Sequence, residues 1–388
     1  MPASMLRLRS GEQRVTNIEL FFDLVYVFAI TQLSHHLLAH QSVEGAAQTA
    51  LLLGMVWLAW SYTAWVTNWL DPDRLPVRLL LIGLMLASLV MSAGLPRAFS
   101  DRAMAVGAAY AAMQIGRTIF VVFAVRGNPL LRNFQRILAW CVVSGSLAVL
   151  GALFHGHARE LLWLGAVAVD SLGGAVGYYT PGIGRSQTNE WTIEGGHFAE
   201  RCQAFVIIAL GESIVVIGGT LSALAHVTSA EIGAFAVSFL GCTALWWIYF
   251  DRTADDAAHL IAASSDPGRL GRSAYHFVHP VMIAGIIVTA AADEQVLSHP
   301  TAIAHAPTRW MIAGGTVLFL VGHALFKAIV WRVVPWTRLA AAAALAVLFA
   351  ALSHVSALAL GTCALAAVLA VALADRVLRP NETPAPVA

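Results

Sequence analysis

Apolar residues fill this chain in runs of about 20, and short polar connections separate the runs over almost the whole length. A helix needs about 20 apolar residues to cross the hydrocarbon core of a bilayer. The pattern therefore predicts an all-α, polytopic bundle of about twelve transmembrane helices. We expect these spans near residues 17–38, 44–69, 75–95, 102–125, 134–154, 159–178, 197–221, 230–250, 274–297, 308–330, 336–353 and 355–376. The final two runs could instead form one broken or re-entrant segment.

The same pattern divides the chain into a cytoplasmic N-terminal segment (1–15), a transmembrane helix bundle (16–377) and a disordered C-terminal tail (378–388). Positive charges test the number of spans, because cytoplasmic connections of membrane proteins carry an excess of arginine and lysine. If the N-terminus is inside, the outer connections hold only Arg97, Arg102, Arg159 and Arg309. This alternation favours twelve spans, with both termini on the cytoplasmic side of the inner (plasma) membrane.

Composition excludes a water-soluble protein. Hydrophobic residues make up 59% of the 388 residues and charged residues 12%, whereas soluble chains carry about 25% charged residues. The net charge of +1 provides no basic surface for nucleic acid. The partners that we expect are the lipid bilayer and an ion or small solute, and the sequence leaves open whether the chain forms a homo-oligomer. The sequence implies no cofactor and no metal site.

Two carboxylates in the first apolar run are the most informative polar residues. Glu19 and Asp23 lie four residues apart, so they share one face of a helix. A charge at membrane depth costs at least about 2.5–3.5 kcal/mol on insertion scales. Such a pair therefore needs cationic partners, a proton, an ion or a water-filled cavity.

Other ionisable residues fall at a similar predicted depth, near the cytoplasmic side. Intramembrane ionisable residues face the bundle interior or a cavity and pair with one another. We therefore expect one buried cluster, used for substrate or ion binding or as a proton relay. Its candidate residues are Glu19, Asp23, Arg117, His197, Glu200, Arg201, Asp251, His276 and His279, with Glu212 deeper and with Asp170 and His323 as secondary members.

His197, Glu200 and Arg201 stand at i, i+3 and i+4 of one predicted helix. A histidine and a glutamate at that spacing can ligate a metal, but Arg201 would repel a cation. An ion pair of Arg201 with Glu19, Asp23 or Glu200 is the better interpretation, because a guanidinium binds both oxygens of a carboxylate. A buried Glu212 could either bind a proton or hydrogen-bond a neighbouring helix.

Several of these motifs together resemble the bacterial low temperature requirement A (LtrA) family. The resemblance rests on Glu19-Leu-Phe-Phe-Asp23, on His197-Phe-Ala-Glu200-Arg201 running into Gly211-Glu212-Ser213, on Trp246-Trp247-Ile-Tyr-Phe-Asp251, and on Tyr275-His276 to His279-Pro280. It covers roughly residues 14–376. It implies a multi-pass membrane protein, and the family name describes a growth trait rather than a chemistry.

Three classes of function remain compatible with these residues. The first is a transporter or channel for an ion or small polar solute, in which the carboxylates and histidines exchange protons. The second is an intramembrane enzyme that acts on a lipid-linked substrate by general acid–base catalysis. The third is a structural or sensory protein in which the polar residues only fix helix packing. An even number of spans also raises the hypothesis of a duplicated six-plus-six repeat.

Overall fold

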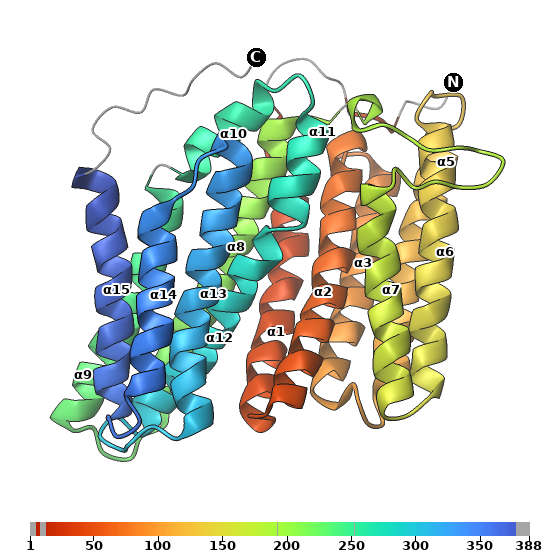
Figure 1. The fold of residues 1–388 in the computed structure, drawn as a ribbon. Coiled ribbons are helices and arrows are strands. Elements are labelled where there is room, and N and C mark those ends of the chain that lie inside the picture. Colours follow the sequence, from red (N-terminus) through yellow and green to blue (C-terminus); the bar gives the residue numbers. More distant parts are fainter. Residues whose placement is uncertain (1–4, 8–12, 192, 252, 378–388) are drawn as a thin grey trace. The chain divides into compact units, whose positions relative to one another are not determined.

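The computed structural model describes residues 5–7, 13–191, 193–251 and 253–377, and its regular elements are helices (Figure 1). Ten helical segments are long and apolar enough to cross a membrane. The predicted all-helical, membrane-type architecture is therefore confirmed. Helices α7 and α14 fall outside these ten, because α7 carries Arg159, Glu160 and Asp170 and α14 has only 16 residues. The predicted disordered tail lies outside the described residues.

The chain forms two compact units. Unit 1 comprises residues up to His36, Glu44–Phe205 and Ile261–Arg272, and unit 2 comprises Leu37–Val43, Val206–Leu260 and Ser273 onward. The helices of unit 1 are α1 (Asn17–Ala39), α2 (Val43–Trp69), α3 (Leu75–Gly94), α4 (Ala103–Ala111), α5 (Arg117–Ala124), α6 (Leu131–Leu153), α7 (His157–Ala175), the start of α8 (Gly195–Ala223) and α11 (Pro267–Leu270). The helices of unit 2 are the rest of α8, α9 (Ser229–Phe250), α10 (Thr253–Ala262), α12 (His279–Ser298), α13 (Ala306–Trp331), α14 (Trp336–Ala351) and α15 (Ala357–Val377).

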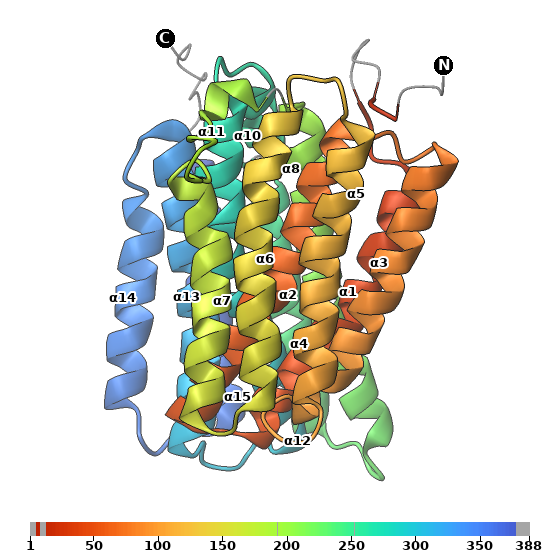
Figure 2. The ribbon, with the colours of Figure 1, turned by 90° about the vertical axis from the view of Figure 1, so that its right-hand side faces the viewer.

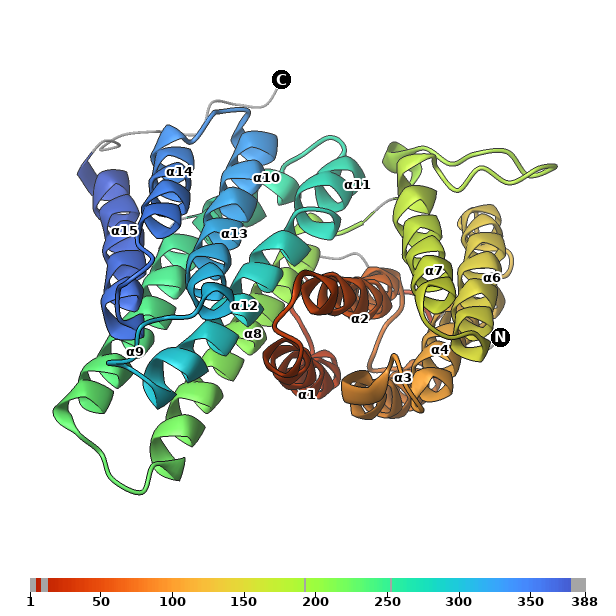
Figure 3. The ribbon, with the colours of Figure 1, turned by 60° about the horizontal axis from the view of Figure 1, so that its bottom comes forward.

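In unit 1, α4 lies beside α6 and α6 beside α7 (Figure 2). Helix α1 lies beside α2, and α3 beside α4 (Figure 3). The predicted span 102–125 contains a π-helical turn, Ala112–Gly116, between α4 and α5. Each π turn inserts a residue into the α-helical ladder and is frequent at functional sites, so the residues after it face a direction that regular α-helical spacing would not give.

In unit 2, α12 packs against α13, α9 against α15, and α13 against α14. Glycines allow the close approach of α12 and α13, since a Cβ added at Gly285 would meet the backbone of Phe319. A second π-helical turn, Gly271–His276, precedes α12. Thr228 is the N-cap residue of α9, and its backbone N–H donates to Glu231 at 2.8 Å in a capping box.

Candidate functional site: a buried carboxylate–arginine network

The carboxylates of α1 are buried where the local sequence starts the helix. Thr16 precedes α1, and both its backbone N–H and its hydroxyl donate to Glu19 Oε2 at 2.9 Å, as in one half of a capping box. Glu19 is 0% exposed and Asp23, one turn further, is 1% exposed. The opposite face of the helix presents apolar side chains such as Phe21 and Leu24, which are exposed as a lipid-facing surface would be.

Arg201 of α8 joins the two carboxylates. Its Nη2 donates to Asp23 Oδ1 at 2.6 Å and its Nε to Asp23 Oδ2 at 3.2 Å, which is a two-pronged contact. Its Nη1 donates to Glu19 Oε1 at 3.1 Å and to Thr67 Oγ1 at 3.0 Å. Trp60 Nε1 donates to Asp23 Oδ1 at 2.7 Å. The Arg201 guanidinium therefore binds both carboxylates and fixes their positions relative to each other.

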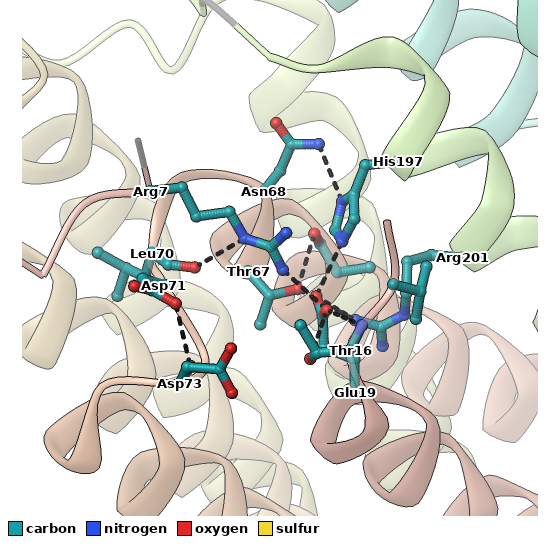
Figure 4. Close-up of polar contacts among 12 residues, drawn as sticks. Arg7, Thr16, Glu19, Thr67, Asn68, Leu70, Asp71, Asp73, His197 and Arg201 are labelled. Atoms are coloured by element: carbon teal, nitrogen blue, oxygen red, sulfur yellow. Dashed lines mark hydrogen bonds and ion pairs between the residues drawn. The ribbon is translucent and has the colours of Figure 1, made fainter. Parts of the chain in front are cut away.

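His197 contacts the same carboxylate oxygen of Glu19, Oε1, as Arg201 does (Figure 4). The amide of Asn68 is oriented by Glu194, because Asn68 Oδ1 accepts from the Glu194 N–H at 2.7 Å and Nδ2 donates to the Glu194 carbonyl at 2.8 Å. Nδ2 also lies 3.3 Å from His197 Nδ1, which must then accept. The hydrogen of a neutral His197 is thereby assigned to Nε2, from which it is donated to Glu19 Oε1 at 3.0 Å.

Arg7 completes the network from the N-terminal segment (Figure 4). Its Nη2 donates to Glu19 Oε2 at 2.8 Å and its Nε to the Leu70 carbonyl at 3.3 Å. The segment is fixed to the end of α2, because the Arg7 N–H donates to the Trp69 carbonyl at 2.9 Å and Leu6 bridges to Leu70. Two carboxylates then face two guanidiniums, and all four carboxylate oxygens accept hydrogen bonds. This balance satisfies the requirement that buried charges be paired.

A cavity of about 650 Å³ adjoins the network at Arg7. It is formed by the N-terminal segment, the end of α2, the connection after α5 and the start of α6. Its lining comprises Leu6, Arg7, Trp69, Asn128, Pro129, Leu130, Arg132, Asn133, Arg136 and Glu190. Arg7 therefore contacts both the cavity and Glu19, and this links an open space to the buried acids.

A second polar network of unit 1 is centred on the π-helical turn. Gln114, in this turn, accepts from Arg117 through its carbonyl oxygen and donates to Asp170 Oδ2 through its amide nitrogen. Tyr110 donates to the same oxygen. Arg117 Nη1 also donates to the Ala59 carbonyl and to Thr63 Oγ1, each at 3.2 Å. Arg117 and Asp170 are thus linked through an amide rather than in direct contact.

Two buried histidines of unit 2 bond to other side chains, one to a tyrosine and one to an arginine. His279 Nε2 lies 2.7 Å from the Tyr249 hydroxyl, and its ring stacks on Tyr275. Arg338 Nε donates to His323 Nδ1 at 2.7 Å, and Arg338 Nη1 donates to Asp375 at 2.8 Å. These contacts include one close arginine–carboxylate pair, Arg338 with Asp375. The other groups are histidine and tyrosine rings.

Comparison with known proteins gives the family of the chain independently of these contacts. Residues 14–373 match the family of the bacterial low temperature requirement A protein, LtrA. The chain belongs to this family. It is also 38% identical over 323 residues to the uncharacterized protein RA0937 of Rhizobium meliloti (strain 1021), which covers 82% of this chain and 78% of that protein. No solved structure matches the chain. The predicted LtrA membership is therefore confirmed.

The predicted site residues of this LtrA-family protein separate into groups. Glu19, Asp23, His197 and Arg201 contact one another, as the sequence predicts for a buried cluster. Glu200 does not join them, because its side chain is exposed and accepts from the Val15 N–H at 3.1 Å. Successive residues of a helix point about 100° apart around its axis. The side chain of Glu200 therefore points to a different face of α8 from that of Arg201.

The other predicted residues lie elsewhere in the LtrA fold. Arg117 and Asp170 are buried in the second network of unit 1. Glu212, His276, His279 and His323 are buried residues of unit 2. Asp251 is exposed and lies 3.7 Å from Arg376. Within unit 1, the described contacts place Arg117 and Asp170 in a different network from Glu19 and Asp23.

Sequence reasoning missed several partners in the LtrA fold. Trp60 and Thr67 of α2 and Gln114 of the π-helical turn bind the charged groups directly, and Asn68 of α2 binds His197. A signal was present in α2, where Trp60 and Thr67 are seven residues apart and therefore lie on one face. Arg7 carried no such signal, because its contact with Glu19 depends on how the N-terminal segment folds back.

Proposed function

We propose that the protein is a transporter or channel for an ion or small polar solute, and that the Glu19–Asp23–Arg201–His197 network lies on its pathway. The proposal includes twelve spans, with α7 and α14 as the two added to the ten apolar helices, and both termini in the cytoplasm. The alternation of arginine between connections supports this topology. The cavity beside Arg7 would then open to the cytoplasm.

The observation that carries the proposal is the shared position of Arg7. Its guanidinium lines the 650 Å³ cavity and also binds Glu19 at 2.8 Å. A solute or ion in the cavity would compete with Glu19 for Arg7. Loss of that partner would leave Glu19 with Arg201, His197 and Thr16, and a cation entering the network would offset the lost positive charge. Such an exchange would couple occupancy of the cavity to the charge balance of the buried network.

A purely structural role would predict closed polar pairs with no cavity leading to them, so the cavity counts against it. An intramembrane enzyme would need a carboxylate oxygen available to take a proton from a substrate. All four oxygens of Glu19 and Asp23 accept hydrogen bonds from protein donors. This full engagement favours charge exchange within the network over catalysis on a substrate.

Flux into proteoliposomes tests the proposal. Purified protein would be reconstituted and assayed for movement of protons, Na⁺, K⁺ and small anions with internal reporters. We expect a flux that Asp23→Asn reduces at least about tenfold, because this change removes a charge from the network at almost constant volume. Glu200→Gln is the matched control and should leave the flux intact. If Asp23→Asn leaves a measured flux unchanged, the proposed pathway is wrong.

Cysteine labelling tests the topology separately. With α6 and α7 both spanning, cysteines introduced at Arg126 and at Arg185 should react with an impermeant reagent from the same side of the membrane. With α14 spanning, cysteines at Arg332 and at His354 should react from opposite sides. Labelling of Arg126 and Arg185 from opposite sides would exclude α7 as a span.

A further inference from the structure

A small cavity of unit 2 lies among four helices that pack against one another, α9, α12, α13 and α15. Its volume is about 30 Å³, which is room for one or two water molecules. The described lining consists of aliphatic residues and glycine, apart from Thr289, Asp293 and Thr316. Asp293 is therefore the one ionisable residue of this lining, and it lies on an otherwise mostly apolar surface.

The carboxyl of Asp293 has no compensating cation. No ion pair within the described part of the chain includes it, and α13 and α15 bring no ionisable residue to the described lining. From α9 the thiol of Cys242 lies near the carboxyl, but it donates to the Leu210 carbonyl at 3.6 Å. Asp293 Oδ2 is completely enclosed and receives no hydrogen bond from the described residues. A molecule in the cavity therefore cannot supply the missing partner of that oxygen.

The hydroxyls of the lining offer acceptors rather than donors. Thr289 Oγ1 donates to the Gly285 carbonyl at 2.9 Å and Thr316 Oγ1 to the Ile312 carbonyl at 3.4 Å. Each hydroxyl therefore uses its single hydrogen within its own helix. Ser238 of α9 lies near the carboxyl, and its hydroxyl has no hydrogen-bond partner among the described residues. One neutral donor does not compensate a buried carboxylate, which is stabilised by a cation or by roughly two or three hydrogen bonds.

We infer that Asp293 is a proton-binding site, a neutral carboxylic acid at neutral pH that exchanges its proton through the small cavity. An ionised carboxylate would place part of its charge on the enclosed Oδ2, and a buried group without a partner takes up a proton instead. The lining suits the acid, because Thr289 and Thr316 keep lone pairs that can accept its hydrogen, directly or through a water. A metal cation suits it less, since the lining brings only three oxygen-bearing side chains and hard cations take about six oxygen ligands.

The proton site goes beyond the proposed pathway and does not rest on it. Asp293 and its cavity belong to unit 2, whereas the Glu19 network belongs to unit 1. In the proposed twelve-span topology, α12 ends on the outer side, and Asp293 lies about 7 Å of helix before that end. The residue as a whole is half-buried rather than buried, which leaves a route by which its proton exchanges. Uptake or release of that proton changes the charge of unit 2 by one.

Infrared spectroscopy of the purified full-length protein in detergent tests the site, because the C=O stretch of a protonated carboxylic acid is separate from the bands of a carboxylate and shifts in D₂O. At neutral pH we expect a protonated-acid band that Asp293→Asn removes. Asp293→Glu keeps an acid at the same position, so its band should persist at a changed frequency. Glu294→Gln is the matched control, because Glu294 is the next residue of α12 and is not part of the described lining. It should leave the band intact.

The spectra decide the proton site whatever the flux assay shows. A band that Asp293→Asn removes, that Asp293→Glu keeps and that shifts in D₂O supports the site. A spectrum from which Asp293→Asn removes no such band shows an ionised carboxylate and overturns it. A band present in choline chloride but absent in sodium chloride identifies Na⁺ as the ligand and overturns the proton.

Thermal unfolding of the same variants is a second measurement. Asp293→Asn resembles the protonated acid in shape and charge, so it should not lower the unfolding midpoint. A clear fall in the midpoint, or failure of this variant to fold while Glu294→Gln folds normally, would mean that a charged carboxylate stabilises the protein. That result would also overturn the proton site.

Discussion

Arg201 of unit 1 and Arg338 of unit 2 are both completely buried, yet they hold carboxylates in different surroundings. Arg201 binds two acids that are themselves 0% and 1% exposed. Arg338 binds Asp375, whose side chain is 27% exposed, and the neutral His323. The two arginines are therefore equally buried, and the two sites differ in the exposure of the carboxylates that the arginines bind.

This difference determines what each arginine contributes. An acid that keeps contact with solvent can be hydrated when its partner is removed, whereas a fully buried acid remains as an uncompensated charge. The first network is also linked through Arg7 to a cavity, and under the proposed function its charge balance would respond to an occupant of that cavity. Arg201 should therefore be central to both stability and function, and Arg338 chiefly to local packing.

Removal of Arg201 should give the largest effect. Arg201→Met leaves Glu19 and Asp23 buried with one guanidinium fewer, and we expect a loss of about 3–5 kcal/mol. The measurement is thermal and denaturant unfolding of the purified protein in detergent. Adding Glu19→Gln and Asp23→Asn to the same chain should recover part of the loss, because no uncompensated acid then remains. An unfolding midpoint of Arg201→Met equal to that of the unmodified protein would contradict the comparison.

Removal of Arg338 should have a smaller effect under the same conditions. Arg338→Met deprives His323 Nδ1 of its donor, but Asp375 can be hydrated, so we expect a loss of about 1–3 kcal/mol. The control is Arg376→Met, which removes an exposed arginine near Asp251 and should change stability little. A loss as large as that of Arg201→Met would show that partner exposure does not govern these two sites.

Thr67→Val sharpens the comparison by removing the hydroxyl without changing shape, and with it the hydrogen bonds to Arg201 and to the Ala64 carbonyl. Thr67 Oγ1 accepts from Arg201 Nη1 at 3.0 Å, and its loss should cost about 1 kcal/mol or slightly more. Thr362→Val is the matched control, because Thr362 is exposed and bonds only its own helix at Leu358. Equal unfolding midpoints for the two variants would mean that the contact of Thr67 with Arg201 adds nothing to stability.

Glu200→Gln should have the smallest effect. Although Glu200 precedes Arg201 directly, its exposed carboxylate accepts only from the Val15 N–H among the described contacts. We expect a change within about 0.5 kcal/mol, as for ordinary surface substitutions. The same unfolding assay measures it. A loss above about 2 kcal/mol would mean that Glu200 belongs to the buried network as the sequence first indicated.

The sequence predicted the helical class and the central contact of the site from simple physical constraints. The cost of burying Glu19 and Asp23 required a cation, and Arg201 was a suitable residue at matching depth. The prediction was less successful where direction around a helix mattered, because depth along the axis says nothing about rotation. Glu200 and Asp251 therefore have suitable depths but exposed side chains.

Two further features could not be derived from local pattern. The contact of Arg7 with Glu19 depends on a β-bridge between Leu6 and Leu70, which are far apart in the sequence. The hydrogen bonds of Gln114 depend on a π-helical turn, for which the apolar run 102–125 gives no obvious marker. Both are products of tertiary packing rather than of residue preference.

The π-helical turn at Ala112–Gly116 also has an evolutionary consequence. It accommodates one residue more than a continuous α-helix would, so it is a natural place for a single-codon insertion or deletion. Losing that residue would turn everything downstream in the helix by about 100° and would carry Arg117 away from Ala59 and Thr63. Family members shorter by one position here should therefore lack an arginine at the site of Arg117, or hold it by another set of contacts.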